Sequence, residues 1–258
     1  MLSIRAACIS HKGKVREKNE DNFVFFGAVA DENGENGTVH FGTSVLNSNI
    51  LLGVFDGMGG TVCGERASQI AAECALRFHF ADKADVRSAL EEICYEANNS
   101  ICSEMVNVVN GRMGSTASML CFTDNICTLC NIGDSPIYLL REKKMYKISQ
   151  EHTEYENYIK IMGHEPPPGK KFKLTQHLGI LPEEMDIEPF IAQDNIYNGD
   201  RFLICSDGVT DMLLEDELIG ALAGDHSPDK TVEMLLKTSL YKGGKDNITA
   251  ICAEITES

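Results

Sequence analysis

Three aspartates of this 258-residue sequence lie at the ends of short apolar runs. Asp56 follows ILLGVF, Asp207 follows RFLICS, and Asp246 immediately precedes NITAIC. Runs of this length and composition are typical of buried strands, so each carboxylate is expected at the rim of a core. A single Asp-Gly after a strand is usually a turn, but three rim carboxylates need pairing, hydrogen bonds or a metal. Because Mg²⁺ and Mn²⁺ prefer carboxylate oxygens, the pattern favours a divalent metal site.

An arginine and two acidic residues, Arg16, Glu20 and Asp21, lie close together in VREKNEDNF. Taken alone, this segment is a charged loop before a strand. Next to a metal site, the arginine could hold phosphate oxygens through two parallel hydrogen bonds, while the acids hold metal-bound water. The grouping therefore suits phosphoryl chemistry, provided that the fold brings it to the aspartates.

The elements that must position these residues come in blocks. Short apolar or β-branched runs predict early strands at residues 3–10, 22–28, 37–46 and 50–55. Apolar residues at three- and four-residue steps then predict two amphipathic helices between Gly64 and Asn107. Later strands are expected at 115–123, 126–132, 136–141, 145–148, 201–206 and 247–255, and later helices near 215–223 and 229–241. Because no β-α-β alternation repeats, we expect an α+β fold of packed sheets covered by helices.

A single domain is expected over residues 1–258, because no linker or low-complexity tract divides the chain. Residues 149–175 are polar, contain three consecutive prolines and match neither the helical nor the strand period. They predict an irregular, flap-like excursion from the core.

The overall charge limits the classes of partner. Thirty-nine acidic and 23 basic side chains give a formal charge of −16, which repels nucleic acid phosphates and anionic lipids. We therefore expect no nucleic acid and no membrane partner. The first residues lack the apolar run of a signal peptide, so a cytoplasmic location is expected. Ten cysteines then read as reduced thiols, including Cys127 and Cys130, although these two form a C-x-x-C.

Seven motifs, taken in order, resemble the metal-dependent protein phosphatases of the type 2C (PPM) family, especially its compact bacterial members. They are VREKNED, VFDGMGG, GSTA (114–117), IGDS (132–135), LTQHLG (174–179), FLICSDG and GGKDNIT (243–249). The resemblance covers about residues 5–255. It implies four layers, α-β-β-α, in which a central sandwich of two mostly antiparallel sheets has a helix pair on each side. It also implies a metal cleft at one edge of the sandwich.

The resemblance implies a role for each candidate ligand. Asp56 would bridge two Mn²⁺ or Mg²⁺ ions, and the Gly57 carbonyl would bind one of them. Asp207 and Asp246 would complete the protein ligands of the other ion. Oxygen ligands alone do not decide between the two metals.

The remaining candidates would act around these ions. Glu20 and Asp21 would act mainly through metal-bound water. Asp134 in IGDS, together with Asp207, resembles the site of a third, weaker ion. Arg16 would hold the phosphate oxygens while a metal-bridging water attacks phosphorus in line, so no covalent phosphoenzyme is expected.

The implied function is a serine/threonine protein phosphatase that hydrolyses phosphoserine and phosphothreonine monoesters in phosphorylated proteins and opposes a bacterial serine/threonine kinase. The alternative is a catalytically silent scaffold of the same fold that binds phosphoproteins. The complete set of three aspartates and Arg16 argues against a scaffold. A phosphodiesterase acting on nucleotides is disfavoured by the acidic charge and by the lack of a base-stacking aromatic cluster.

The chain departs from the family pattern at two positions. Many eukaryotic relatives have a histidine after the Asp-Gly, proposed as general acid, whereas this chain has Met58, which cannot donate a proton. Pro136 follows GDS where arginine is common, and should alter a strand edge rather than chemistry. Separately, Cys63 precedes a predicted helix, so oxidative control is a hypothesis beside the simpler one of a passive small residue.

Overall fold

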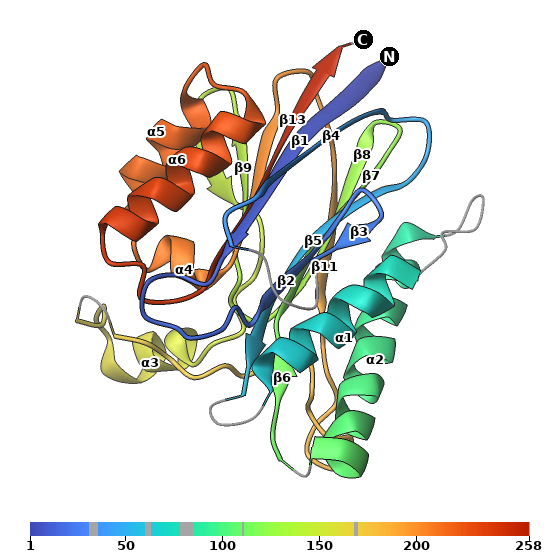
Figure 1. Ribbon diagram of the computed structural model, residues 1–258, viewed down its shortest axis with the longest axis vertical. Helices are drawn as coiled ribbons and strands as arrows, with labels where there is room; N and C mark the ends of the chain where they lie inside the picture. The colour runs from blue at the N-terminus through green and yellow to red at the C-terminus, as the bar shows by residue number, and fades with distance from the viewer. Residues whose placement is uncertain (31–35, 60–62, 78–84, 110, 168–169, 258) are drawn as a thin grey trace.

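The computed structural model describes residues 1–30, 36–59, 63–77, 85–109, 111–167 and 170–257. Two β-sheets pack face to face, and helices cover the outer face of each sheet (Figure 1). Every pairing between the described strands is antiparallel. The expected α+β fold with α-β-β-α layers is therefore confirmed.

The two sheets contain six and seven strands. The first has the order β10-β9-β12-β13-β1-β4, with bounds Lys144–Lys147, Ile137–Arg141, Arg201–Cys205, Ile248–Glu257, Leu2–His11 and Val39–Val45. The second has the order β11-β8-β7-β5-β2-β3, with bounds Phe190–Asn195, Ile126–Ile132, Ala117–Thr123, Ile50–Met58, Asp21–Phe25 and Ala28–Val29. The short strand β6, Gly114–Ser115, pairs with the end of β5.

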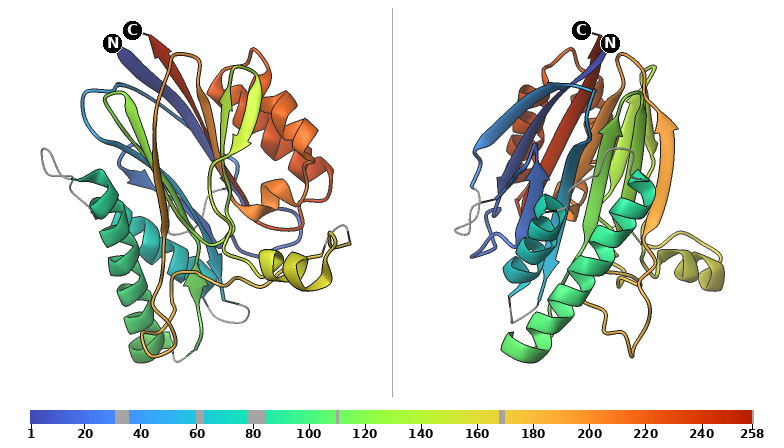
Figure 2. Two further views of the ribbon diagram at one scale, coloured as in Figure 1. Left: turned by 180° about the vertical axis from the view of Figure 1, so that it is seen from behind. Right: turned by 90° about the vertical axis from the view of Figure 1, so that its right-hand side faces the viewer.

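Helices cover both outer faces of the sandwich (Figure 2). α1 (Gly64–Arg77) and α2 (Val86–Glu104), which a π-helical turn at Met105–Val109 follows, pack on the second sheet. α4 (Asp207–Thr210), α5 (Glu215–Ala223) and α6 (Pro228–Tyr241) pack on the first. No described helix is long and apolar enough to cross a bilayer.

The central strands are apolar on both faces because each face is covered. On β5, Leu52 and Val54 point into the sandwich, whereas Phe55 points toward α1 and α2. The same alternation separates Cys127 from Cys130 on β8, since the first lies between the sheets and the second lies under α2. The two thiols of the C-x-x-C therefore face different cores and do not form a shared site.

α3 (Tyr155–Met162) and β11 are among the elements that the sequence did not predict. Residues 149–175 are not wholly irregular, because α3 forms within them and ends at Gly163, whose φ of 71° suits a helix C-terminus. β11 was not expected, because only the first half of FIAQDN is apolar. It forms at the sheet edge by pairing with β8, so tertiary contact rather than local pattern decides its structure.

Candidate metal centre

Asp21 and Asp56 face each other across neighbouring strands. The antiparallel register of β2 and β5 pairs these two residues directly. Asp21 is buried, and its Oδ2 accepts a hydrogen bond of 2.7 Å from the Ser206 hydroxyl. The Asp56 N–H donates to Thr116 Oγ1 at 3.0 Å, and the Thr116 N–H donates back to the Asp56 carbonyl at 2.9 Å. These backbone contacts position the Asp56 carboxylate beside that of Asp21.

A tight junction between α4 and β13 brings Asp207 and Asp246 to the same place. Asp207 begins α4, and Asp246 lies two residues before β13. A Cβ atom on Gly208 would lie 1.8 Å from the Asn247 carbonyl oxygen, so only glycine allows this approach. Gly208 therefore allows the backbone of α4 to pack closely against the backbone at Asn247.

Asn247 ties the loop that carries Arg16 to this junction. Its amide nitrogen donates to the Lys12 and Lys18 carbonyls, each at 2.9 Å, and its Oδ1 accepts from the Glu20 N–H at 2.8 Å. Its side chain is buried, so these bonds are sheltered from water. The hydrogen bonds of one amide thus fix the segment before β2 against the start of β13.

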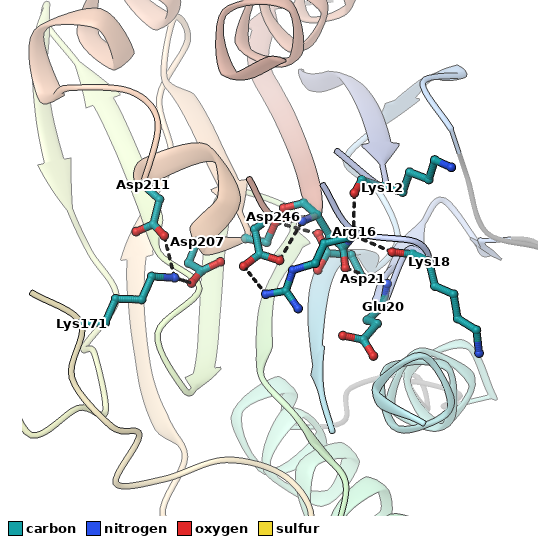
Figure 3. Close-up of polar contacts among 11 residues, drawn as sticks. Lys12, Arg16, Lys18, Glu20, Asp21, Lys171, Asp207, Asp211 and Asp246 are labelled. Carbon is teal, nitrogen blue, oxygen red and sulfur yellow. Dashed lines mark hydrogen bonds and ion pairs between the residues drawn. The ribbon is translucent and has the colours of Figure 1, made fainter. Parts of the chain in front are cut away.

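Two cationic side chains contact the carboxylates (Figure 3). Arg16 Nη2 lies 2.7 Å from Asp246 Oδ2. Lys171 Nζ lies 3.0 Å from Asp207 Oδ2 and 2.6 Å from Asp211 Oδ2. Lys171 comes from the segment expected to be a flap, so this segment reaches the centre.

Glu20 and Gly57 meet at the first residue of α1. The Gly57 N–H donates to the Glu20 carbonyl at 3.1 Å, and a Cβ on Gly57 would lie 2.2 Å from the Gly64 carbonyl oxygen. A Cβ on Gly64 would lie 2.8 Å from Glu20 Oε1. Burial raises the pKa of Glu20, and the nearby Glu65 raises it further.

Burial and mutual repulsion raise the pKa values of the central carboxylates. Burial raises the pKa of Asp21 to about 7. Burial and then the neighbouring carboxylates, Asp21 first, raise the pKa of Asp56 well above its ordinary value. Burial and then Asp207 raise the pKa of Asp134 to about 6, so Asp134 belongs to the same electrostatic cluster. Burial also raises the pKa of Asp207.

These residues fit a divalent cation. Asp21 Oδ1 is buried and has no hydrogen-bond donor among the described residues. The carboxylates of Asp207 and Asp246 lie near it. Such an oxygen needs positive charge, and hard divalent ions supply it. No three acidic, histidine or cysteine side chains of the described part are already arranged around one point. Two of the carboxylates contact Arg16 and Lys171 instead.

The structure describes Cys63 and the two positions that depart from the family pattern, Met58 and Pro136. Met58 ends β5 and pairs with Gly114 of β6. Cys63 is half-buried, has a φ of 59° and packs against the core under α1 and α2. Residues 60–62 of the intervening loop lie outside the described residues. Pro136 immediately precedes β9, and its carbonyl accepts from the Cys205 N–H at 3.2 Å.

The sequence reasoning missed four residues that hold the centre: Lys171, Asp211, Ser206 and Asn247. Ser206 and Asn247 stand next to the predicted aspartates, and their polarity within apolar runs was the available signal. Lys171 carries no such signal, because nothing local shows that its segment folds back over the centre.

The chain matches the family model for protein phosphatase 2C over residues 32–238. It is 28% identical over 261 residues to the serine/threonine protein phosphatase PstP of Mycobacterium tuberculosis, covering 99% of this chain and 46% of PstP. It thus spans about half the length of that relative. It is 26% identical over 262 residues to the serine/threonine phosphatase stp of Listeria monocytogenes, covering 94% of this chain and 92% of stp.

A solved structure gives the same result for the fold. The catalytic domain of PstP, in complex with two manganese ions, aligns over the whole of both chains with a TM-score of 0.79 and 26% identity. The family match, the full-length likeness of fold and the clustered carboxylates agree with the resemblance found in the motifs. The chain belongs to the protein phosphatase 2C family.

Proposed function

We propose that the chain is a metal-dependent serine/threonine protein phosphatase that removes phosphate from phosphoserine and phosphothreonine in proteins. One observation carries the proposal: carboxylates from β2, β5, the start of α4 and the segment before β13 gather beside one arginine, Arg16. The names of the relatives and the two manganese ions of PstP support it.

Two Mn²⁺ or Mg²⁺ ions are the proposed cofactors. Asp56 would contact both ions, the Gly57 carbonyl one of them, and Asp207 and Asp246 the other. When bound, the ions would provide a nucleophilic water near neutral pH and offset the charge of the phosphate. Burial and then the neighbouring carboxylates raise the pKa of Asp56, and bound cations would stabilise its charged form against both effects.

The other acids are proposed to act around the two ions. Glu20 and Asp21 would hold them through intervening water. Asp134 and Asp207 would form a third, weaker site. Burial beside one another raises the pKa of these three aspartates, as expected for carboxylates that share a cation.

Arg16 is the proposed phosphate ligand. Its side chain is 48% exposed, and among the described residues it bonds to one oxygen of Asp246, so donors are left for a substrate. A guanidinium can hold two phosphate oxygens at once and stabilise the charge that they carry in the transition state. Asp246 would orient Arg16 for this task.

Phosphate release from a phosphothreonine peptide tests the proposal. Purified protein is assayed with Mn²⁺, with Mg²⁺ and with EDTA, beside Asp207→Ala and Asp246→Ala. We expect release only with metal, and a loss of at least about 100-fold in each variant, because each removes a metal ligand.

Asp194→Asn is the matched control, since Asp194 is an exposed carboxylate that pairs with Arg141 away from the centre. It should retain full activity. A folded wild-type protein that binds phosphopeptides but releases no phosphate would favour the silent scaffold instead.

Three broader statements stay predictions. A cognate serine/threonine kinase would supply the substrates, the protein would act in the cytoplasm, and residues 1–258 would form one catalytic domain with 149–175 as its flap. The ion pair between Lys171 and Asp207 supports the last of these, because it joins a residue of segment 149–175 to a carboxylate of the centre.

A further inference from the structure

A short basic strip lies beside the acidic centre. Residues 170–173, KKFK, contain three of the 23 basic side chains of a chain whose formal charge is −16. We call these four residues the KKFK strip. Lys171 anchors the strip through Asp207 and Asp211 (Figure 3). The strip is therefore held next to the place where the proposed function puts the phosphate.

The KKFK strip separates two hollows. The inner hollow, 340 Å³, reaches the centre, since Asp134, Asp207 and Asp211 line it. The outer hollow, 580 Å³, lies against α3, with Tyr158 and Ile161 in its wall. Lys170, Lys171 and Phe172 line both hollows. A peptide that leaves the centre through the inner hollow thus passes over the strip into the outer one.

The outer hollow combines positive charge with apolar surface. Lys170 Nζ lies 3.7 Å from the centroid of the Tyr158 ring and 5.1 Å from that of Phe172. Among the described residues, neither Lys170 nor Lys173 has a carboxylate partner. Ile161 is 80% exposed, and Glu154 is the one acidic residue among the described lining. Ring faces orient a lysine but do not neutralise it, so two ammonium groups are available to an anion.

We infer that the outer hollow binds the segment of a phosphoprotein substrate that flanks the phosphoresidue, and that it selects acidic side chains through Lys170 and Lys173. The inference rests on the proposed phosphatase function and names its substrate class. An acidic substrate would otherwise be repelled by the net charge of the chain. The strip supplies attraction where the flanking segment must lie, and Tyr158, Ile161 and Phe172 supply the apolar contact.

Matched phosphothreonine peptides test the inference. One set carries Asp or Glu at successive positions on either side of the phosphothreonine, and the others carry Asn or Gln, or Lys, at the same positions. We expect kcat/KM to be about 3- to 10-fold higher for an acidic than for a neutral peptide, which is the scale of one or two exposed ion pairs. The preference should vanish in about 0.5 M salt, because salt screens such pairs.

The double variant Lys170→Glu, Lys173→Glu should reverse the order of acidic and lysine-bearing peptides. Lys171 stays unchanged in it, so the contact with Asp207 is kept. Lys144→Glu, an exposed lysine of β10, is the matched control and should keep the wild-type preference. Hydrolysis of p-nitrophenyl phosphate, which has no flanking segment, should be the same in all three proteins.

The outcomes separate the two proposals. If the wild type hydrolyses neither peptides nor p-nitrophenyl phosphate, the phosphatase function fails. If it hydrolyses both but shows no acidic preference, or if the double variant keeps that preference, only the inference fails. If the double variant loses p-nitrophenyl phosphate activity, the single variant Lys173→Gln replaces it as the test. Lys173→Gln should show a weaker preference for acidic peptides than wild type. An unchanged preference in Lys173→Gln would overturn the inference.

Discussion

Three carboxylates of the centre have different partners, which set the charge around each of them. Asp246 is held by Arg16, Asp207 by Lys171, and Asp21 by the Ser206 hydroxyl on one oxygen only. The cationic partners offset charge at the exposed side of the cluster. The buried oxygen of Asp21 has no such partner among the described residues, so protonation or a metal must relieve it.

The stability of the metal-free protein should fall as pH rises through the range in which Asp21 titrates. The folded-state pKa of Asp21 is about 7, above its ordinary value of 3.8. Between these values the folded chain holds a proton that the unfolded chain has released, so each increase in pH favours unfolding. Asp21→Asn should therefore be more stable than wild type at pH 7.5 by on the order of 1–3 kcal/mol.

Urea unfolding in EDTA at several pH values measures this difference. The gap between Asp21→Asn and wild type should shrink as the pH falls from 7.5 toward 4.5, because folded wild type then regains the proton on Asp21 while the unfolded chain is still largely ionised there. Asp194→Asn, on the exposed surface, should follow wild type at every pH. A gap that stays constant would contradict the raised pKa.

Removal of the Lys171 ammonium should strengthen Mn²⁺ binding. The side chain contacts Asp207, and its two carboxylate partners raise its pKa against the opposing effect of burial, so it stays charged near neutral pH. A fixed positive charge beside a metal ligand opposes a second cation. Because the Lys171 side chain is 62% exposed, solvent screens much of the repulsion between its ammonium group and the ion. We therefore expect the Kd for Mn²⁺ to be about 3- to 10-fold lower in Lys171→Ala.

Isothermal titration with Mn²⁺ reports this affinity without relying on turnover. Lys171→Arg keeps the charge and should bind as wild type does. Weaker binding by Lys171→Ala would mean that the lysine orders Asp207 for the ion rather than competing with it.

At the scale of elements, close backbone packing brings the candidate ligands together. β2 and β5 pair Asp21 with Asp56 by register, and the junction between α4 and β13 brings Asp207 to Asp246. Neither arrangement depends on long side chains. Both depend on how closely two main chains approach, which is why glycines follow two of the aspartates.

Gly208→Ala tests the α4–β13 junction. The added methyl group would meet the Asn247 carbonyl oxygen at 1.8 Å, so α4 must shift. We expect a loss of about 2–3 kcal/mol in the free energy of unfolding and a drop in Mn²⁺ affinity.

Gly220→Ala is the matched control within α5. A Cβ there meets nothing within 4 Å, so alanine should be neutral or stabilise the helix by up to about 1 kcal/mol. Equal unfolding free energies for the two variants in urea would show that α4 tolerates the methyl group.

The molecule as a whole has three apolar layers and an acidic charge that its metals would partly offset. One core lies between the sheets, and one lies under each helix pair. The centre joins Asp21 and Asp56 from strands of the second sheet to Asp207 and Asp246, which adjoin strands of the first, so a bound ion would link the two halves of the sandwich. Metal binding and global stability are therefore expected to be coupled.

Saturating Mn²⁺ should raise the unfolding midpoint. At 100 times Kd, a ligand that binds only the folded state adds about 2.7 kcal/mol, which corresponds to roughly 5–10 °C for a chain of this size. Thermal unfolding measures this shift in the midpoint. Wild type and the double variant Asp56→Asn, Asp207→Asn are each unfolded with Mn²⁺ and with NaCl at equal ionic strength. The same rise in the double variant would indicate general charge screening rather than a bound ion.

Most elements of the sandwich could be predicted from the sequence, because the spacing of apolar residues within a short segment is enough to indicate a strand or a helix. The strand that carries Asp56 and the strand that follows Asp246 are apolar runs of clear length, and the apolar residues of α1 and α2 recur at regular helical spacing. α3 and β11 could not be predicted in this way. α3 is only eight residues long and lies within a polar segment, and the second half of β11 is polar. β11 forms by pairing with β8, and Tyr155 and Tyr158 of α3 pack against the Phe172 ring.

The sequence by itself was enough to identify the family and to predict which residues would carry the chemistry, since motif order and residue type single out the aspartates and Arg16. Only the tertiary structure decided how those residues are held. The pairing of Asp21 with Asp56, the three hydrogen bonds of Asn247, and the reach of Lys171 into the centre join segments far apart in the chain. Local propensity contains no information about such contacts, because they arise only when separate elements pack against one another.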